Sequence, residues 1–336
     1  MANERRVAVV INPRAQGATA AMIGWLRTQV PAEDLFVPTS AGDARATIGR
    51  VVERGYDVLV TGGGDGLFMD AAAELIRLAP ATMPALLPLR LGTGNAVHDV
   101  TASSPPTRQG LARDLARARD PRERSSPLRL LDVDGRITQF TGVGLDADWA
   151  ADYAWLIKRH VGNGRLLPLV RGGPGYLATA FGLTIPRLIR RPFVAVKLIA
   201  VGGAARLDGE GRPTRTFADG AVVYEGPATL ACASTVPSYS AGFRFFTNVD
   251  RIGDAFEIKV GIASPFDVVR HVRHLLGGGR DDERVLAFSA RGLRVELPTP
   301  ARYHVGGDVL AATRRFTIAL APRTVPVLRP GRLPSR

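Results

Sequence analysis

The first 90 residues alternate short apolar runs of β type with amphipathic helical patterns, and this alternation constrains the fold more than any other feature. The apolar runs are Val7–Ile11, Leu35–Val37, Asp57–Thr61 and Ala85–Leu89, and the helical patterns between them are Ala18–Val30, Asp43–Arg54 and Leu67–Leu78. Strands that are separated by helices at this spacing predict a parallel, doubly wound sheet. Ligands of such sheets bind beyond the carboxyl ends of the strands, so the turns after the strands form the candidate site.

The pattern changes after an Arg-rich helical segment, Thr107–Arg119, and a polar linker, Asp120–Pro127. Segments of β type dominate the rest of the chain, which predicts a mostly antiparallel β-sandwich. We therefore expect an α/β domain at 1–127, a β-rich domain at 128–321 and a fraying Pro/Arg tail at 322–336.

Composition and cysteine content place the chain among globular proteins of a reducing compartment. The 336 residues are 46% hydrophobic and 22% charged, and the single cysteine, Cys232, can form neither an internal disulfide nor a CxxC metal site. The apolar run Val7–Ile11 is too short for the core of a signal peptide. The uncharged stretch at 172–186 contains four glycines and two prolines, and it is too short to span a bilayer. We expect a cytoplasmic protein.

Basic residues exceed acidic ones by 13, and the excess is concentrated in one segment. Residues 153–207 contain nine Lys or Arg and no Asp or Glu. This segment predicts attraction to an anionic membrane surface, and Trp155 beside Lys158 and Arg159 favours an interfacial position on the inner face of the membrane. A solvated basic face of an Arg-rich chain is the alternative. Nucleic acid is not expected as a partner, because the sequence has no Cys/His finger and no aromatic-rich RNA-binding motif.

The strongest local feature is a strand that runs into the turn Gly62-Gly63-Gly64-Asp65-Gly66 and then into a helix. Glycines let the backbone approach a polyphosphate closely and expose N–H groups where a helix begins. A carboxylate at such a place, Asp65, either serves a metal ion or accepts a proton from an attacking hydroxyl. The alternative is a simple turn in which Asp65 caps a helix.

A second glycine loop, Leu91–Asn95, follows the next strand and repeats this arrangement with a Thr93 hydroxyl and an Asn95 amide. Two such loops one strand apart favour a ligand site. Generic motifs do not account for them, because the chain has no GxxxxGK[ST] loop and no GxGxxG fingerprint. An acyl-transfer site is not expected either, because no GxSxG elbow occurs.

The order and spacing of these motifs resemble the diacylglycerol kinase catalytic-domain family, which includes sphingosine, ceramide and bacterial lipid kinases. The matching motifs in the first part are NPxxxG at 12–17, TSAGDA at 39–44, GGDG at 63–66 followed by Asp70, and PLxLGTGN ending at Asn95. Further motifs are FTGVGLDA at 140–147, PGYLATAF at 174–181 and VGGDVL at 305–310. The resemblance extends over nearly the whole chain.

The resemblance implies an α/β nucleotide-binding domain followed by a β-sandwich, with ATP and Mg²⁺ as cofactors and a lipid alcohol as substrate. The implied ATP-binding residues are Asn12, Pro13, Gly17, Thr39, Gly63, Gly64, Asp65, Gly66, Gly92, Thr93, Gly94 and Asn95. Asp65 and Asp308 are the candidate catalytic residues, and Asp254 is the candidate metal ligand.

The chain departs from the family pattern at four polar positions. Leu67 replaces the threonine after GGDG, Ala96 replaces the aspartate after GTGN, and the D-G pair of the metal-binding loop reads Gly253-Asp254. The D-G-E triplet reads Gly306-Gly307-Asp308, so the proposed proton acceptor of the bacterial lipid kinases is a glycine here. Two functions stay open. One is an ATP-dependent lipid kinase with an altered site, and the other is a kinase-fold protein that binds nucleotide or lipid without turnover.

Overall fold

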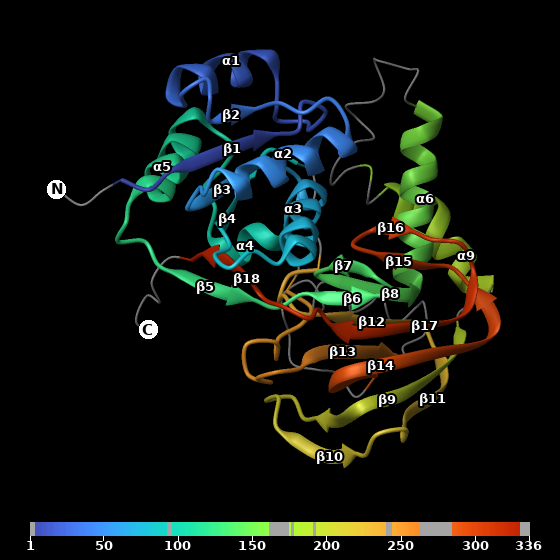
Figure 1. Cartoon of the computed structure of the whole chain (residues 1–336). Helices are drawn as coiled ribbons and strands as arrows, with labels where there is room; N and C mark the ends of the chain where they lie inside the picture. The colour runs from blue at the N-terminus through green and yellow to red at the C-terminus, as the bar shows by residue number, and fades with distance from the viewer. Residues whose placement is uncertain are drawn as a thin grey trace. The chain divides into compact units, whose positions relative to one another are not determined.

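A computed structural model describes residues 4–92, 96–160, 175, 178–190, 193–239, 244–262 and 284–329. The chain forms two compact units (Figure 1). Unit 1 comprises Met1–Arg129 and Pro322–Arg336, and unit 2 comprises Leu130–Ala321. None of the helices in the described ranges combines the length and the apolarity that crossing a bilayer requires.

Unit 1 is built on a six-stranded sheet with the order β2-β1-β3-β4-β18-β5. Its strands are β1 (Val7–Ile11), β2 (Leu35–Phe36), β3 (Val58–Gly63), β4 (Ala85–Arg90), β5 (Ser125–Leu128) and β18 (Val325–Leu328). All neighbours pair in parallel except β18 and β5. Strands β1 and β3 are buried along their whole length, as continuous apolar runs of parallel strands require.

Helices cover both faces of this sheet, so the predicted doubly wound α/β fold is confirmed (Figure 1). They are α1 (Ala20–Gln29), α2 (Ala41–Glu53), α3 (Asp65–Leu78), α4 (Ala96–Thr101) and α5 (Arg108–Arg119). The hydroxyl oxygens of Thr19, Ser40 and Thr107 accept backbone N–H groups at the starts of α1, α2 and α5. These side-chain caps explain why each helix begins where it does.

Unit 2 is a curled sheet of twelve antiparallel strands, which confirms the predicted β-rich second domain. The strands are β6 (Leu131–Val133), β7 (Arg136–Thr138), β8 (Phe140–Gly144), β9 (Val194–Leu207), β10 (Pro213–Phe217), β11 (Val222–Ala228), β12 (Leu230–Ser234), β13 (Phe256–Gly261), β14 (Val285–Ala301), β15 (Tyr303–Val305), β16 (Asp308–Val309) and β17 (Thr313–Leu320). One face packs into a core that includes Phe256, Ile258 and Phe288.

Three helical segments of unit 2 are α6 (Leu145–His160), the π-helical turn η1 (Ala180–Thr184) and α9 (Ile185–Arg190). Asp152 of α6 is buried and joins the three segments. Its carboxylate accepts the Thr184 hydroxyl at 3.0 Å and pairs with the Arg187 guanidinium at 2.8 Å.

The last described strand corrects the prediction of a fraying Pro/Arg tail over 322–336. Val325–Leu328 forms β18, which pairs with β4 on one side and β5 on the other. Val325, Val327 and Leu328 are fully buried. The chain leaves unit 2 after β17 and returns to unit 1, so this short apolar stretch completes the parallel sheet.

If β18 is part of the core, Leu328→Ala will lower the free energy of unfolding of unit 1. We expect a loss of about 2–5 kcal/mol, because truncating a fully buried leucine removes apolar contacts and leaves a cavity. Chemical denaturation measures the change, with the exposed Arg323→Ala as a matched control. Equal stability of the two variants would contradict a structural role for this strand.

Candidate active site

The carboxyl ends of β1 and β3 and the loop after β4 are joined by backbone hydrogen bonds. The Asn12 N–H donates to the Gly62 carbonyl at 2.8 Å, and the Gly17 N–H donates to the Leu91 carbonyl at 2.8 Å. The Leu91 N–H in turn donates to the Gly63 carbonyl at 3.2 Å. Three of the motifs identified in the sequence therefore lie together at one edge of the sheet.

Glycines at this edge are required because the backbones lie too close for side chains. A Cβ atom on Gly92 would lie 2.1 Å from the Cα of Gly64 and 2.6 Å from its nitrogen. A Cβ on Gly17 would lie 3.1 Å from the Cα of Leu91. The glycine loops after β3 and β4 thus touch backbone to backbone. The predicted residues Thr93, Gly94 and Asn95 lie outside the described residues.

Asp65 is the first residue of α3, but its carboxylate binds the start of a different helix. One oxygen accepts the Ala96 N–H at 3.1 Å, and the other accepts the Val97 N–H at 3.2 Å. These are the first two residues of α4, so Asp65 stabilises the N-terminus of α4 by hydrogen bonding and by its charge. Helix α3 itself has Gly64 as its N-cap, which offers no side chain.

Burial sets the protonation of Asp65 and of its neighbour His98. Burial raises the pKa of Asp65, although His98 and the two N–H donors act in the opposite direction. The His98 Nδ1 lies 3.9 Å from the Asp65 carboxylate, and burial lowers the pKa of this histidine. Each Asp65 oxygen keeps further lone pairs, and a raised pKa makes the carboxylate a better proton acceptor.

Asn12 and Thr39, which the resemblance assigns to ATP, both take part in local turns. The Asn12 side-chain oxygen accepts the Arg14 N–H at 3.0 Å, which shapes the turn after β1. Thr39 follows β2, and its N–H donates to the Asp43 carboxylate at 2.9 Å. Pro13 and Thr39 are exposed, so both can be reached from solvent.

Asp308 and Asp254 belong to unit 2, whereas Asp65 belongs to unit 1. Asp308 begins β16 after the turn Gly306-Gly307, and its side chain is exposed. Asp254 is exposed in the turn before β13, where its carbonyl accepts the Arg291 Nε–H at 3.3 Å. Within the described part of the chain, no three or more His, Cys, Asp or Glu side chains are placed to hold a metal ion.

At two of the positions that depart from the family pattern, the residue present is buried in the core of unit 1. Leu67 lies on the buried face of α3. Ala96 is fully buried and contributes its N–H to the Asp65 carboxylate. At the third departure, a Cβ on Gly306 would lie 2.8 Å from the Thr138 hydroxyl oxygen.

Sequence reasoning missed a buried polar network in unit 2. The Tyr239 hydroxyl lies 2.7 Å from both the Asp146 carboxylate and the His304 Nε2. His304 Nε2 is also 3.1 Å from the same carboxylate oxygen. Asp146 lies within the motif FTGVGLDA, but the sequence gives no sign that it meets a histidine 158 residues further along.

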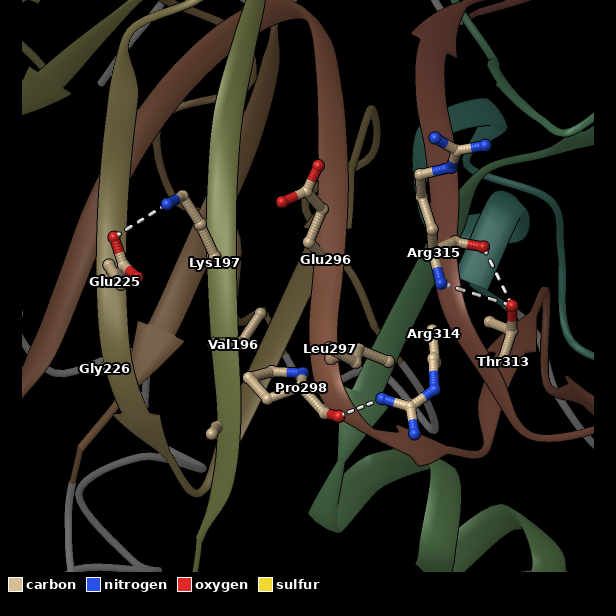
Figure 2. Close-up of a pocket in the computed structure, with 11 residues that line it drawn as sticks. Val196, Lys197, Glu225, Gly226, Glu296, Leu297, Pro298, Thr313, Arg314 and Arg315 are labelled. Carbon is tan, nitrogen blue, oxygen red and sulfur yellow. Dashed lines mark hydrogen bonds and ion pairs between the residues drawn. The ribbon is translucent and has the colours of Figure 1, made fainter.

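A cavity of about 750 Å³ is lined by residues of β9, β11, β14 and β17 (Figure 2). Figure 2 shows Lys197 pointing toward Glu225, and the two side chains form an ion pair at 3.1 Å. The Arg314 guanidinium donates to the Pro298 carbonyl. Side chains of both charge signs line this cavity, and none of the predicted site residues lines it.

Comparison with known proteins identifies the domain that carries the glycine loops. Residues 6–120 match the family model described as the diacylglycerol kinase catalytic domain. The matched segment makes up about a third of the chain. The resemblance seen in the sequence is thereby confirmed, and unit 1 carries a kinase catalytic domain. No curated protein matches the chain.

Solved structures share the fold over the whole length. The chain is 18% identical, with a TM-score of 0.65, to a "putative diacylglycerol kinase" from Bacillus anthracis str. Sterne, and the match covers 98% of this chain and 99% of that one. A diacylglycerol kinase structure from the same organism is 16% identical with a TM-score of 0.63, covering 98% of each chain. At these identities the likeness shows the fold alone, and it extends over both units.

The close contact of the two glycine loops in the kinase domain can be tested with a pair of alanine variants. Gly92→Ala will destabilise unit 1, because the new methyl group collides with the backbone of Gly64. Gly66→Ala is the control, because it lies inside α3 with open space around it and alanine favours a helix by about 1 kcal/mol. Thermal unfolding should show opposite shifts, and equal shifts would contradict the predicted contact.

Proposed function

We propose that the chain is an ATP-dependent lipid kinase, which transfers the γ-phosphoryl group of ATP to a hydroxyl of a diacylglycerol- or sphingoid-like lipid. The observation that carries the proposal is the contact between Gly92 and Gly64 at the start of α3, within a kinase catalytic domain. Helix α3 has a glycine N-cap at this contact, so no N-cap side chain occupies its first N–H groups. Such a helix start suits phosphate groups.

The residues at this edge fit a nucleotide polyphosphate. Gly63–Gly66 and Gly92–Asn95 would hold the phosphates from two sides, with Asn12 and Gly17 between them and Thr39 near the nucleotide. Mg²⁺ would neutralise charge on the phosphates, with Asp254 as the candidate ligand. Phosphoryl transfer depends mainly on positioning and on charge neutralisation, so this kind of site is sufficient for the chemistry.

The proposed step forms a bond between the lipid oxygen and the γ-phosphorus and breaks the bond from that phosphorus to the oxygen that leaves with ADP. The hydroxyl proton passes to a carboxylate. Asp65 and Asp308 are the candidates, because Gly306 stands where the family has an aspartate. Absence of an optimal base lowers the rate of phosphoryl transfer by a factor of roughly 10²–10⁴. This predicts a slow kinase that still binds ATP.

The test is to incubate the purified chain with labelled ATP, Mg²⁺ and a panel of diacylglycerol, sphingoid and other lipid alcohols. We expect label in at least one lipid, and Asp65→Asn and Asp308→Asn each to lower the rate. ATP should also raise the melting temperature. If ATP stabilises the protein but no lipid is labelled, the kinase proposal fails, and the chain is instead a protein that binds nucleotide without turnover. No stabilisation and no transfer would exclude both.

A membrane-facing surface is the second part of the proposal, and the segment without carboxylates supplies it. Four large apolar side chains are exposed on or next to its helices, with exposed fractions of 51% for Trp155, 57% for Phe181, 49% for Ile189 and 43% for Phe193. Exposed aromatic residues beside cations are typical of surfaces that enter the interface of a bilayer. We propose that these four residues contact the surface of an anionic membrane, on the inner face of the cell membrane.

The cations near these apolar residues favour contact with an anionic membrane over a basic face that contacts only solvent. Lys158 and Arg159 are exposed, and the Arg159 guanidinium lies 5.4 Å from the centre of the Trp155 ring. In contrast, Arg187 pairs with Asp152, and Lys197 on β9 pairs with Glu225. The exposed cations that suit lipid headgroups therefore lie at the end of α6, beside Trp155.

Vesicle sedimentation without ATP tests this surface separately from catalysis. We expect binding to vesicles that contain phosphatidylglycerol, weaker binding to pure phosphatidylcholine, and loss of binding at high salt. Trp155→Ser and Lys158→Gln should each weaken binding, the latter by about 1 kcal/mol. Val201→Ser, an exposed apolar residue on β9, is the control. If binding does not depend on lipid charge and salt concentration, or if Val201→Ser weakens binding as much as the other variants do, this membrane surface is ruled out.

A further inference from the structure

The buried network of Asp146, Tyr239 and His304 lies directly beneath the hairpin that carries Asp308. His304 is in β15, and the turn Gly306-Gly307 joins this strand to β16. The side chains of Asp146 and His304 are almost completely buried. A buried carboxylate is costly unless it is well paired, and the Asp146 carboxylate has hydrogen-bond partners in Tyr239, His304 and Ala147.

The hydrogen bonds around His304 fix its tautomer. The Gly307 N–H donates to Nδ1 at 3.3 Å, so Nδ1 carries no proton. Nε2 therefore carries the proton, and it points at the Tyr239 hydroxyl and the Asp146 carboxylate. The Tyr239 hydroxyl can then donate to Asp146, whose other oxygen accepts the Ala147 N–H at 2.8 Å. The network runs from α6 through the imidazole to the amide of Gly307.

This network acts on a turn that would otherwise be poorly fixed. Gly306 and Gly307 have φ values of +61° and +94°, which suit a two-residue hairpin turn of the I′ type. Two successive glycines lose more conformational freedom on folding than any other pair. The turn is held by the Gly306 N–H, which donates to the Phe140 carbonyl at 2.9 Å, and by the Gly307 N–H on His304.

Neighbouring residues leave room for the network and orient its rings. A Cβ on Gly142 would lie 2.0 Å from the Asp146 carboxylate oxygen, so a side chain at this position would displace it. The Phe140 ring contacts His304 edge-on, with centroids 5.7 Å apart, and lies 4.8 Å from the Tyr239 ring. The Thr141 hydroxyl donates to the His304 carbonyl at 2.6 Å. Both the side chain and the backbone of His304 are therefore held in place.

We propose that His304 is a positioning residue for phosphoryl transfer. It binds the Gly307 amide and so fixes the hairpin that presents Asp308, while Tyr239 and Asp146 hold its imidazole in the tautomer that can accept this N–H. The inference rests on the proposed kinase function. It adds a means by which a hairpin with two glycines can present a carboxylate in one orientation, as a catalytic group requires.

Two conservative variants test the roles of Nδ1 and Nε2 of His304 separately. The oxygen of His304→Asn can stand near the place of Nδ1 and accept the Gly307 N–H. The amide nitrogen of His304→Gln stands near the place of Nε2 and leaves Gly307 without its acceptor. Lipid phosphorylation gives kcat and the KM for ATP, and hydrogen exchange followed by NMR reports the Gly307 amide. Tyr239→Phe tests the support of the imidazole.

We expect His304→Gln to lower kcat about tenfold or more, with the KM for ATP unchanged within about twofold and the Gly307 amide exchanging faster. His304→Asn should retain most of the wild-type kcat and the slow hydrogen exchange of the Gly307 amide. The kcat of Tyr239→Phe should lie between those of the Asn and Gln variants. Equal kcat in the Asn and Gln variants, a reversed ranking, or unchanged exchange at Gly307 would overturn the proposal. If the wild type phosphorylates no lipid, the kinase function fails, while the exchange of Gly307 still shows whether His304 holds the turn.

Discussion

The backbone contact between Gly64 and Gly92 is the constraint on which the candidate active site depends. It brings the start of α3 against the loop after β4 so closely that position 92 has no room for a side chain. Asp65 then reaches the first two amides of α4, which lies just beyond that loop. If the loops were further apart, α4 would lose this carboxylate and Asp65 would lose its two donors. The proposed polyphosphate site and the fold of this edge therefore depend on the same contact.

The alternation of strands and helices was sufficient to predict strands β1 to β4 of unit 1, because a helix follows each of them in the sequence. The strand β18 escaped prediction for the opposite reason. Val325–Leu328 pairs with β4, which lies more than 230 residues earlier in the chain, and its four residues follow a Pro/Arg stretch without any local periodicity. A strand that is stabilised only by distant neighbours gives little local signal.

The distinction between local sequence signals and long-range contacts also applies within the site. The glycine loops were predictable because glycine has a specific backbone use at the end of a strand. The partners of Asp65 were not, since its donors are 31 and 32 residues further along and belong to a helix of six residues. Sequence reasoning treated catalysis and helix capping by Asp65 as alternatives. The structure shows capping, of α4 rather than α3, and the remaining lone pairs leave the carboxylate able to accept a proton.

The two candidate carboxylates differ in what the protein must do to make them useful. Asp65 is nearly buried, is fixed by two N–H groups and has a raised pKa, so its orientation is already set. Asp308 is exposed and follows two glycines, so its orientation depends on the turn before it. The replacement of aspartate by Gly306 removes an acceptor and also loosens the backbone at that point. A chain that retains Asp308 for phosphoryl transfer therefore needs a second group to stiffen the hairpin, and the buried imidazole of His304 is placed to do so.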